Sequence, residues 1–203
     1  MKSNAINLGK IEIPRHDGED QMIVFDMKTL EGIPDGYRGL AEAMLAKIKQ
    51  RDGFAYFTIH GRSLKKTETL RRPAPHTDGN YEPVMMSFGG QGGFKVGETG
   101  PRLHSPLHDR QYNAVNGGLL LASTYPACVG WVGEYDGLPG VGGDCRHLTL
   151  GQPFILEAGM IYYGNNHFIH ESMPVDQDTH RTFVRITLPE DHVFDGQCLE
   201  ISR

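Results

Sequence analysis

Cysteine is scarce in this chain, which has only Cys128, Cys145 and Cys198 among its 203 residues. Three irregularly spaced cysteines cannot build a disulfide framework or a Cys-x-x-Cys zinc site, so we expect a reducing compartment. No run approaches eighteen apolar residues, and the first residues contain no apolar segment of the secretory kind. We therefore expect a soluble, cytoplasmic protein without a membrane partner.

The sequence also lacks blocks of like charge and internal repeats. Its net charge is −5, with acids and bases scattered, which argues against an extended nucleic-acid surface or an anionic-membrane surface. Glycine and proline are abundant, at 26 and 12 residues, and they separate short apolar runs. This pattern favours a turn-rich β architecture, and the length suits a single domain over residues 1–203 with a few flanking helices.

One helix and nine strands are expected. Apolar residues recur at helical spacing over residues 37–50, with Asp35 placed to cap the helix start. The predicted strands cover residues 10–13, 22–25, 54–59, 84–88, 118–122, 128–134, 153–156, 160–163 and 182–188. A mobile loop is expected from the glycine-rich residues 89–93 onward.

The segment 75–81 contains a pattern that is typical of metal binding. His76 and Asp78 are two residues apart, so on an extended chain their side chains point to the same face. Two imidazoles and one carboxylate hold iron(II) in non-haem oxygenases and leave coordination positions open. The candidates for the second imidazole are His167 and His170, of which we favour His170.

Two arginines follow at regular spacing. Arg181 and Arg185 lie eleven and fifteen residues after His170, and they share parity on a predicted strand. Both guanidiniums can therefore point toward the proposed metal. A planar guanidinium is the natural partner of a distal carboxylate.

His76-x-Asp78, the distant His170 and the two spaced arginines resemble the iron(II)/2-oxoglutarate dioxygenases of the taurine dioxygenase and clavaminate synthase type, over about residues 37–192. The resemblance implies a double-stranded β-helix, a jelly-roll barrel of the cupin kind. It implies that His76, Asp78 and His170 bind iron(II), that Arg181 grips the far carboxylate of 2-oxoglutarate, and that Arg185 lies near its keto-acid end or a substrate anion.

The resemblance implies hydroxylation or desaturation of a substrate with O₂, giving succinate and CO₂. Asp78 favours these outcomes over halogenation, because halogenating relatives leave the carboxylate position empty for chloride. Where the family has a Gly-Gly-Asp-Thr segment, this chain has leucines after Gly117 and Gly118. Ser123, Thr124 or Tyr112 would then assist Arg181.

The expected substrate is a small polar metabolite such as an amino acid derivative, because the family favours such substrates and residues 60–75 carry five cations that can meet an acidic group. A nucleobase or a protein side chain is the alternative substrate. A cupin-like protein that binds a metal or small ligand without turnover is the alternative from another class. The oligomeric state is left open.

Overall fold

The computed structural model describes residues 1–46, 48, 51–78, 118–140 and 143–188. In chain order these residues form β1 (Lys2–Ser3), β2 (Ala5–Lys10), β3 (Gln21–Asp26), α1 (Asp35–Leu45), β4 (Phe54–Leu64), β5 (Gly118–Ser123), β6 (Cys128–Trp131), β7 (Gly133–Glu134), β8 (Phe154–Ile155), β9 (Met160–Gly164), β10 (Ile169–Ser172) and β11 (Thr179–Leu188). The predicted mainly β class is confirmed.

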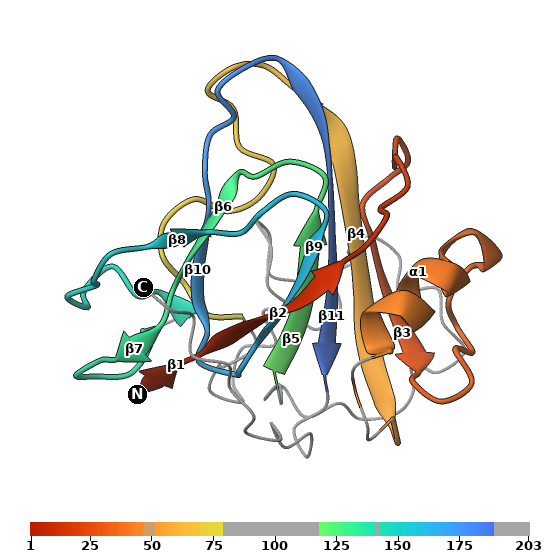
Figure 1. Cartoon of the computed structure of the whole chain (residues 1–203), viewed down its shortest axis with the longest axis horizontal. Helices are drawn as coiled ribbons and strands as arrows, with labels where there is room; N and C mark the ends of the chain where they lie inside the picture. The colour runs from red at the N-terminus through yellow and green to blue at the C-terminus, as the bar shows by residue number, and fades with distance from the viewer. Residues whose placement is uncertain (47, 49–50, 79–117, 141–142, 189–203) are drawn as a thin grey trace, which may run out of the picture.

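The strands form antiparallel sheets. The largest has six strands in the order β2-β9-β5-β11-β4-β3, a second has three in the order β10-β6-β8, and β1 pairs with β7. Figure 1 shows the three-stranded sheet on one side of the six-stranded sheet and α1 beside β3 and β4 on the other. Within the described ranges the sheets do not close, so the predicted jelly-roll barrel is not confirmed.

Helix α1 packs on one face of the six-stranded sheet. Its buried residues are Leu40, Ala41, Met44 and Leu45, which recur at helical spacing and join one cluster with Val184 and Ile186 of β11. The predicted cap is wrong, because Pro34 precedes the first turn and Asp35 is the first helical residue. No helix in the described ranges is long and apolar enough to cross a membrane.

Strand β11 is an inner strand of the six-stranded sheet, and its successive side chains point alternately to the two faces of that sheet. Val184 and Ile186 face α1, whereas Phe183 belongs to a second cluster that contains Phe168, next to β10. Because side chains alternate along a strand, Arg181 and Arg185 share the face of Phe183. This face looks toward the three-stranded sheet.

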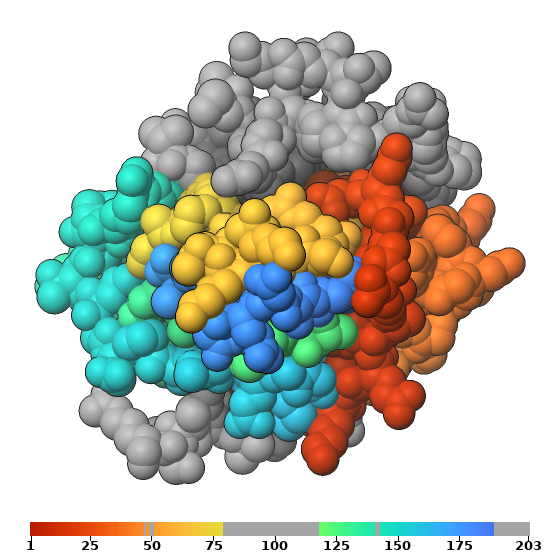
Figure 2. Space-filling view, turned by 90° about the horizontal axis from the view of Figure 1, so that it is seen from above, coloured from red at the N-terminus to blue at the C-terminus, as the bar shows by residue number. Residues whose placement is uncertain are grey.

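The connection between β2 and β3 covers the end of β4 and β11. The His16 backbone N–H donates to Thr182 Oγ1 at 3.1 Å, and the His16 ring is hydrogen-bonded through Nδ1 to the Tyr37 hydroxyl at 2.7 Å. Figure 2 shows the N-terminal residues (red) as a band between the β4 and β11 residues and the orange residues of α1. A Cβ on Gly61 would collide with the His16 carbonyl, so this close approach requires glycine.

Seven of the nine predicted strands correspond to observed strands, although β4 runs five residues beyond its predicted end at 59 and β11 begins three residues before its predicted start at 182. The strand predicted at 10–13 is wrong, because β2 ends at Lys10, after a register shift beside Gly9 at φ 106°. Strand β10, which carries His170, was not predicted. The predicted strand 84–88 and loop from 89 lie outside the described residues, as do residues 47, 49 and 50 at the predicted helix end.

Candidate metal centre

Backbone pairing brings His76 and His170 together. The N–H of each residue donates to the carbonyl of the other, at 3.0 and 2.9 Å, so they form an isolated antiparallel bridge. On the other side, the Thr77 N–H donates to the Gly143 carbonyl at 2.9 Å. Residues directly opposite in such a bridge point to the same face, and the two imidazole centroids are 4.6 Å apart.

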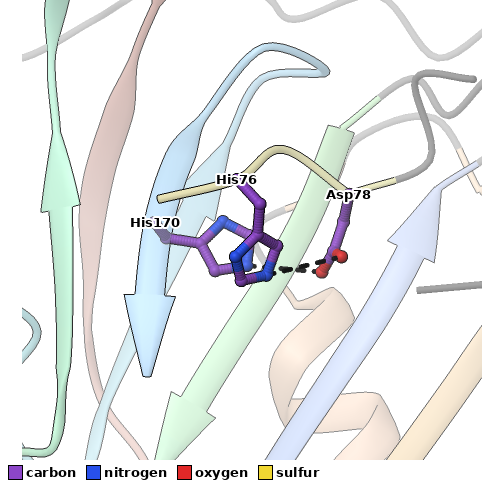
Figure 3. A group of neighbouring side chains, drawn as sticks. All are labelled: His76, Asp78 and His170. Carbon is purple, nitrogen blue, oxygen red and sulfur yellow. Dashed lines mark ion pairs between the residues drawn. The ribbon is translucent and has the colours of Figure 1, made fainter. Parts of the chain in front are cut away.

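Asp78 completes the cluster. One ligand atom from each of His76, Asp78 and His170 lies within 4.8 Å of the others, and all three residues are buried. Figure 3 shows both rings turned toward the carboxylate. Asp78 Oδ2 is 3.3 Å from Nε2 of His170, and Oδ1 is 3.9 Å from Nε2 of His76.

The backbone fixes the tautomer of both histidines. Nδ1 of His76 is 2.7 Å from the Ala74 carbonyl, and Nδ1 of His170 is 3.2 Å from the Phe168 carbonyl. A carbonyl only accepts, so each Nδ1 carries the proton and each Nε2 offers its lone pair to the centre. Metal-bound histidines in proteins have this arrangement.

Burial gives the cluster the protonation state that a divalent metal requires. Burial, followed by the nearby charge of His170, lowers the pKa of His76 to about 3. Burial alone would raise the pKa of Asp78, but the nearby positive charge of Arg185 holds it well below its usual value. At neutral pH His76 is a neutral imidazole and Asp78 a carboxylate, so two donors need no deprotonation before binding.

Arg185 and Arg181 occupy different positions around the cluster. Arg185 Nη1 forms an ion pair with Asp78 Oδ2. Arg181 is fully buried, and its Nε and Nη1 donate to the hydroxyls of Ser123 and Ser172 at 3.0 and 2.9 Å. Arg181 Nη2 is buried and has no hydrogen-bond partner among the described residues.

Of the three residues predicted to assist Arg181, Ser123 contacts it. The Thr124 hydroxyl is hydrogen-bonded to the backbone of Thr182 instead, and Tyr112 lies outside the described residues. Ser172, the second hydroxyl that contacts Arg181, was not among the predicted residues. Its parity with His170 on a short extended segment is the feature that could have identified it.

His167, the alternative second imidazole, is not part of the cluster. It is half-buried in the turn before β10, and burial together with the positive charge of the amino terminus lowers its pKa. The structure thus places His170 beside His76 and Asp78, and His167 near the amino terminus.

The cationic loop predicted from residue 60 to residue 75 divides into outer and inner residues. Lys65 is exposed and pairs with Asp178 at 2.8 Å, and Arg62 is exposed and donates to the Thr69 carbonyl at 3.0 Å. Arg71 instead has its guanidinium 4.9 Å from the ring centroid of Phe183, on the same face of β11 as Arg181 and Arg185.

No protein-family model matches this chain, and a search of curated proteins finds no match either.

Proposed function

We propose that the chain is an iron(II)- and 2-oxoglutarate-dependent dioxygenase that hydroxylates or desaturates a small polar metabolite, such as an amino acid derivative. The observation that carries this proposal is the buried cluster of His76, Asp78 and His170, with both Nε2 lone pairs directed to the carboxylate. Two imidazoles and one carboxylate form the donor set of non-haem iron(II) oxygenases.

In this proposal the three residues would hold iron(II). When bound, the metal supplies the coordination of 2-oxoglutarate and the activation of O₂. The chain holds the two imidazoles through the carbonyls of Ala74 and Phe168 and keeps Asp78 ionised through Arg185. The presence of a carboxylate at residue 78 favours hydroxylation or desaturation over halogenation.

Arg181 supports the cosubstrate assignment. Two serine hydroxyls hold Nε and Nη1, so the guanidinium is fixed in orientation while Nη2 remains available for a ligand carboxylate. Among the described residues Arg181 has no carboxylate partner. A fully buried guanidinium in that state is costly, and a dianionic cosubstrate would offset that cost.

The placement of these groups also supports a jelly-roll barrel as the complete fold. His170 belongs to the three-stranded sheet and Arg181 to the six-stranded sheet. A site between two antiparallel sheets is the arrangement expected for a double-stranded β-helix, in which facing sheets enclose the ligand.

The test is conversion of 2-oxoglutarate to succinate by the purified protein with iron(II) and O₂ and no added substrate. We expect slow succinate formation in the wild-type protein and in His167→Ala, and none above background in Asp78→Ala. A wild-type protein that binds metal but neither binds nor converts 2-oxoglutarate would instead be a cupin-like binding protein.

A further inference from the structure

Arg71 lies on the inner side of its loop, against the residues of the proposed site. Its guanidinium stacks on Phe183, which stands between Arg181 and Arg185 on one face of β11. Its backbone N–H donates at 3.4 Å to the Ser172 hydroxyl, which also accepts from Arg181. Arg71 is therefore tied to the group that orients Arg181.

A chain of two further residues fixes the guanidinium of Arg71. Asp20 Oδ2 lies 2.7 Å from His60 Nδ1, and His60 Nε2 lies 2.7 Å from Arg71 Nη1. An ionised carboxylate only accepts and a guanidinium only donates, so His60 carries its proton on Nδ1 and accepts at Nε2. Burial lowers the pKa of His60, consistent with this neutral form.

The charges around Arg71 favour a negatively charged ligand. Burial and then the charge of Arg185 are the main causes that lower the pKa of Arg71 to about 10. The charge of Arg181 acts in the same direction, and the charges of Asp78 and Asp20 oppose it. Among the described residues, three guanidiniums therefore act on this site together with two carboxylates. A divalent metal and the dianionic 2-oxoglutarate carry equal and opposite charges, so they would leave the balance of these described residues unchanged.

A buried hydroxyl on the same strand face gives a second indication of a ligand. Thr58 is opposite Arg185 in the pairing of β4 with β11 and two residues before His60, so it shares their face. Its side chain is 2% exposed, and Oγ1 has no hydrogen-bond partner among the described residues. Buried polar atoms are normally satisfied, so a polar ligand group is expected here.

We propose that Arg71 determines specificity by binding a carboxylate of the primary substrate, and that His60 and Asp20 are positioning residues that hold Arg71 in place. This inference rests on the proposed oxygenase function and adds a substrate class: a small carboxylic acid without a nearby cationic group. The fixed, planar guanidinium and its aromatic platform suit a carboxylate.

The experiment measures binding in the absence of O₂, separately from turnover. Full-length protein is loaded with Zn(II) and 2-oxoglutarate, and N-acetyl-L-amino acids are compared with their C-terminal amides by ligand-observed NMR. The two members of each pair differ at one group, where a neutral amide replaces the carboxylate. We expect at least one acid to bind about tenfold or more tightly than its amide, as one charge-assisted contact allows.

Arg71→Gln should reduce this acid-to-amide ratio to near one, and the control Arg62→Gln, at an exposed arginine of the same region, should retain it. The inference is overturned if no acid binds, if acids and amides bind alike, or if Arg71→Gln keeps the ratio. A failure of the oxygenase proposal would be recognised in a separate assay, by the absence of succinate formation.

Two variants of His60 test the positioning role. His60→Gln can still accept from Arg71 and donate to Asp20, so we expect it to retain most of the acid-to-amide ratio. His60→Phe fills the space without an acceptor and should lose the ratio. If both variants weaken acids and amides equally and leave the ratio unchanged, His60 is only structural.

Discussion

The guanidinium of Arg181 is hydrogen-bonded to two serine hydroxyls, and its Nη2 has no hydrogen-bond partner among the described residues. Ser123 and Ser172 come from strands of different sheets, and each accepts one N–H from Arg181. Arg185, four residues further along the strand, instead forms an ion pair with Asp78. The two arginines therefore have different contacts, which their spacing in the sequence does not distinguish.

Arg181→Ala should weaken 2-oxoglutarate binding by roughly ten- to a hundredfold, because a charge-assisted carboxylate contact contributes about 1.5–3 kcal/mol. Arg181→Lys should rescue little, since an ammonium cannot reproduce the planar pair of donors. Calorimetric titration of 2-oxoglutarate into Mn(II)-loaded protein measures the effect. If Arg185→Ala loses affinity while Arg181→Ala keeps it, Arg185 is the distal-carboxylate anchor.

The pKa of His76 predicts an acid-sensitive fold. Its value of about 3 in the folded protein lies below the ordinary 6.5, so between these pH values the unfolded chain binds a proton that the folded chain does not. The free energy of unfolding of metal-free protein should therefore fall as the pH falls through this window, by up to about 1.4 kcal/mol per pH unit from this group.

Urea unfolding with a chelator present, at about pH 7 and about pH 5, measures this dependence. His76→Gln removes the titrating group, so its stability should change less between the two conditions. Equal pH dependence in the variant and the wild-type protein would contradict the assignment.

Among the structural elements, the segment that carries His76 and Asp78 is held in its extended conformation by pairing with neighbouring segments more than by its own strand propensity. Residues 75–78 form no named strand, yet they pair with β10 on one side and with residues 143–145 on the other. Gly143 has φ 76°, and a Cβ there would collide with the Thr77 carbonyl oxygen. The absence of a side chain at residue 143 therefore allows the backbone of this loop to lie close to Thr77, between the proposed ligands His76 and Asp78.

Gly143→Ala should push Thr77 away and displace His76 and Asp78 on either side of it. We expect a stability loss of about 1–3 kcal/mol, typical of a non-glycine residue forced into this backbone region, together with weaker metal binding. Gly151→Ala is the matched control, because a Cβ there meets nothing within 4 Å. Equal metal affinity in both variants would show that the approach of Gly143 is not required.

The same pairing explains which elements can be recognised from the sequence alone. Long alternating or apolar segments such as β4 and β11 were predictable, because one strand's own pattern identifies them. Strand β10 has four residues and follows a turn, so its strand character comes from pairing with β6 and His76. Sequence spacing predicted that the arginines would lie close to His76, Asp78 and His170. The contact of Ser172 with Arg181 and the inward orientation of Arg71 could be seen only in the tertiary structure.

At the scale of the whole molecule, the site joins two sheets. His170 and Ser172 come from the three-stranded sheet, and Ser123, Arg181 and Arg185 come from the six-stranded sheet. A metal held here would bind the folded chain and not the unfolded one, so it would also stabilise the arrangement of the sheets. The central claim is therefore that one metal and one 2-oxoglutarate meet at this junction.

The most direct test is titration of 2-oxoglutarate into anaerobic iron(II)-loaded protein, following the metal-to-ligand charge-transfer absorption that arises when the keto acid chelates iron. We expect one iron(II) per chain and a band that saturates at one equivalent in the wild-type protein and in His167→Ala. His76→Ala, Asp78→Ala and His170→Ala should each lose the metal and the band. A wild-type protein without the band, or a His170→Ala variant that keeps it while His167→Ala does not, would contradict the account.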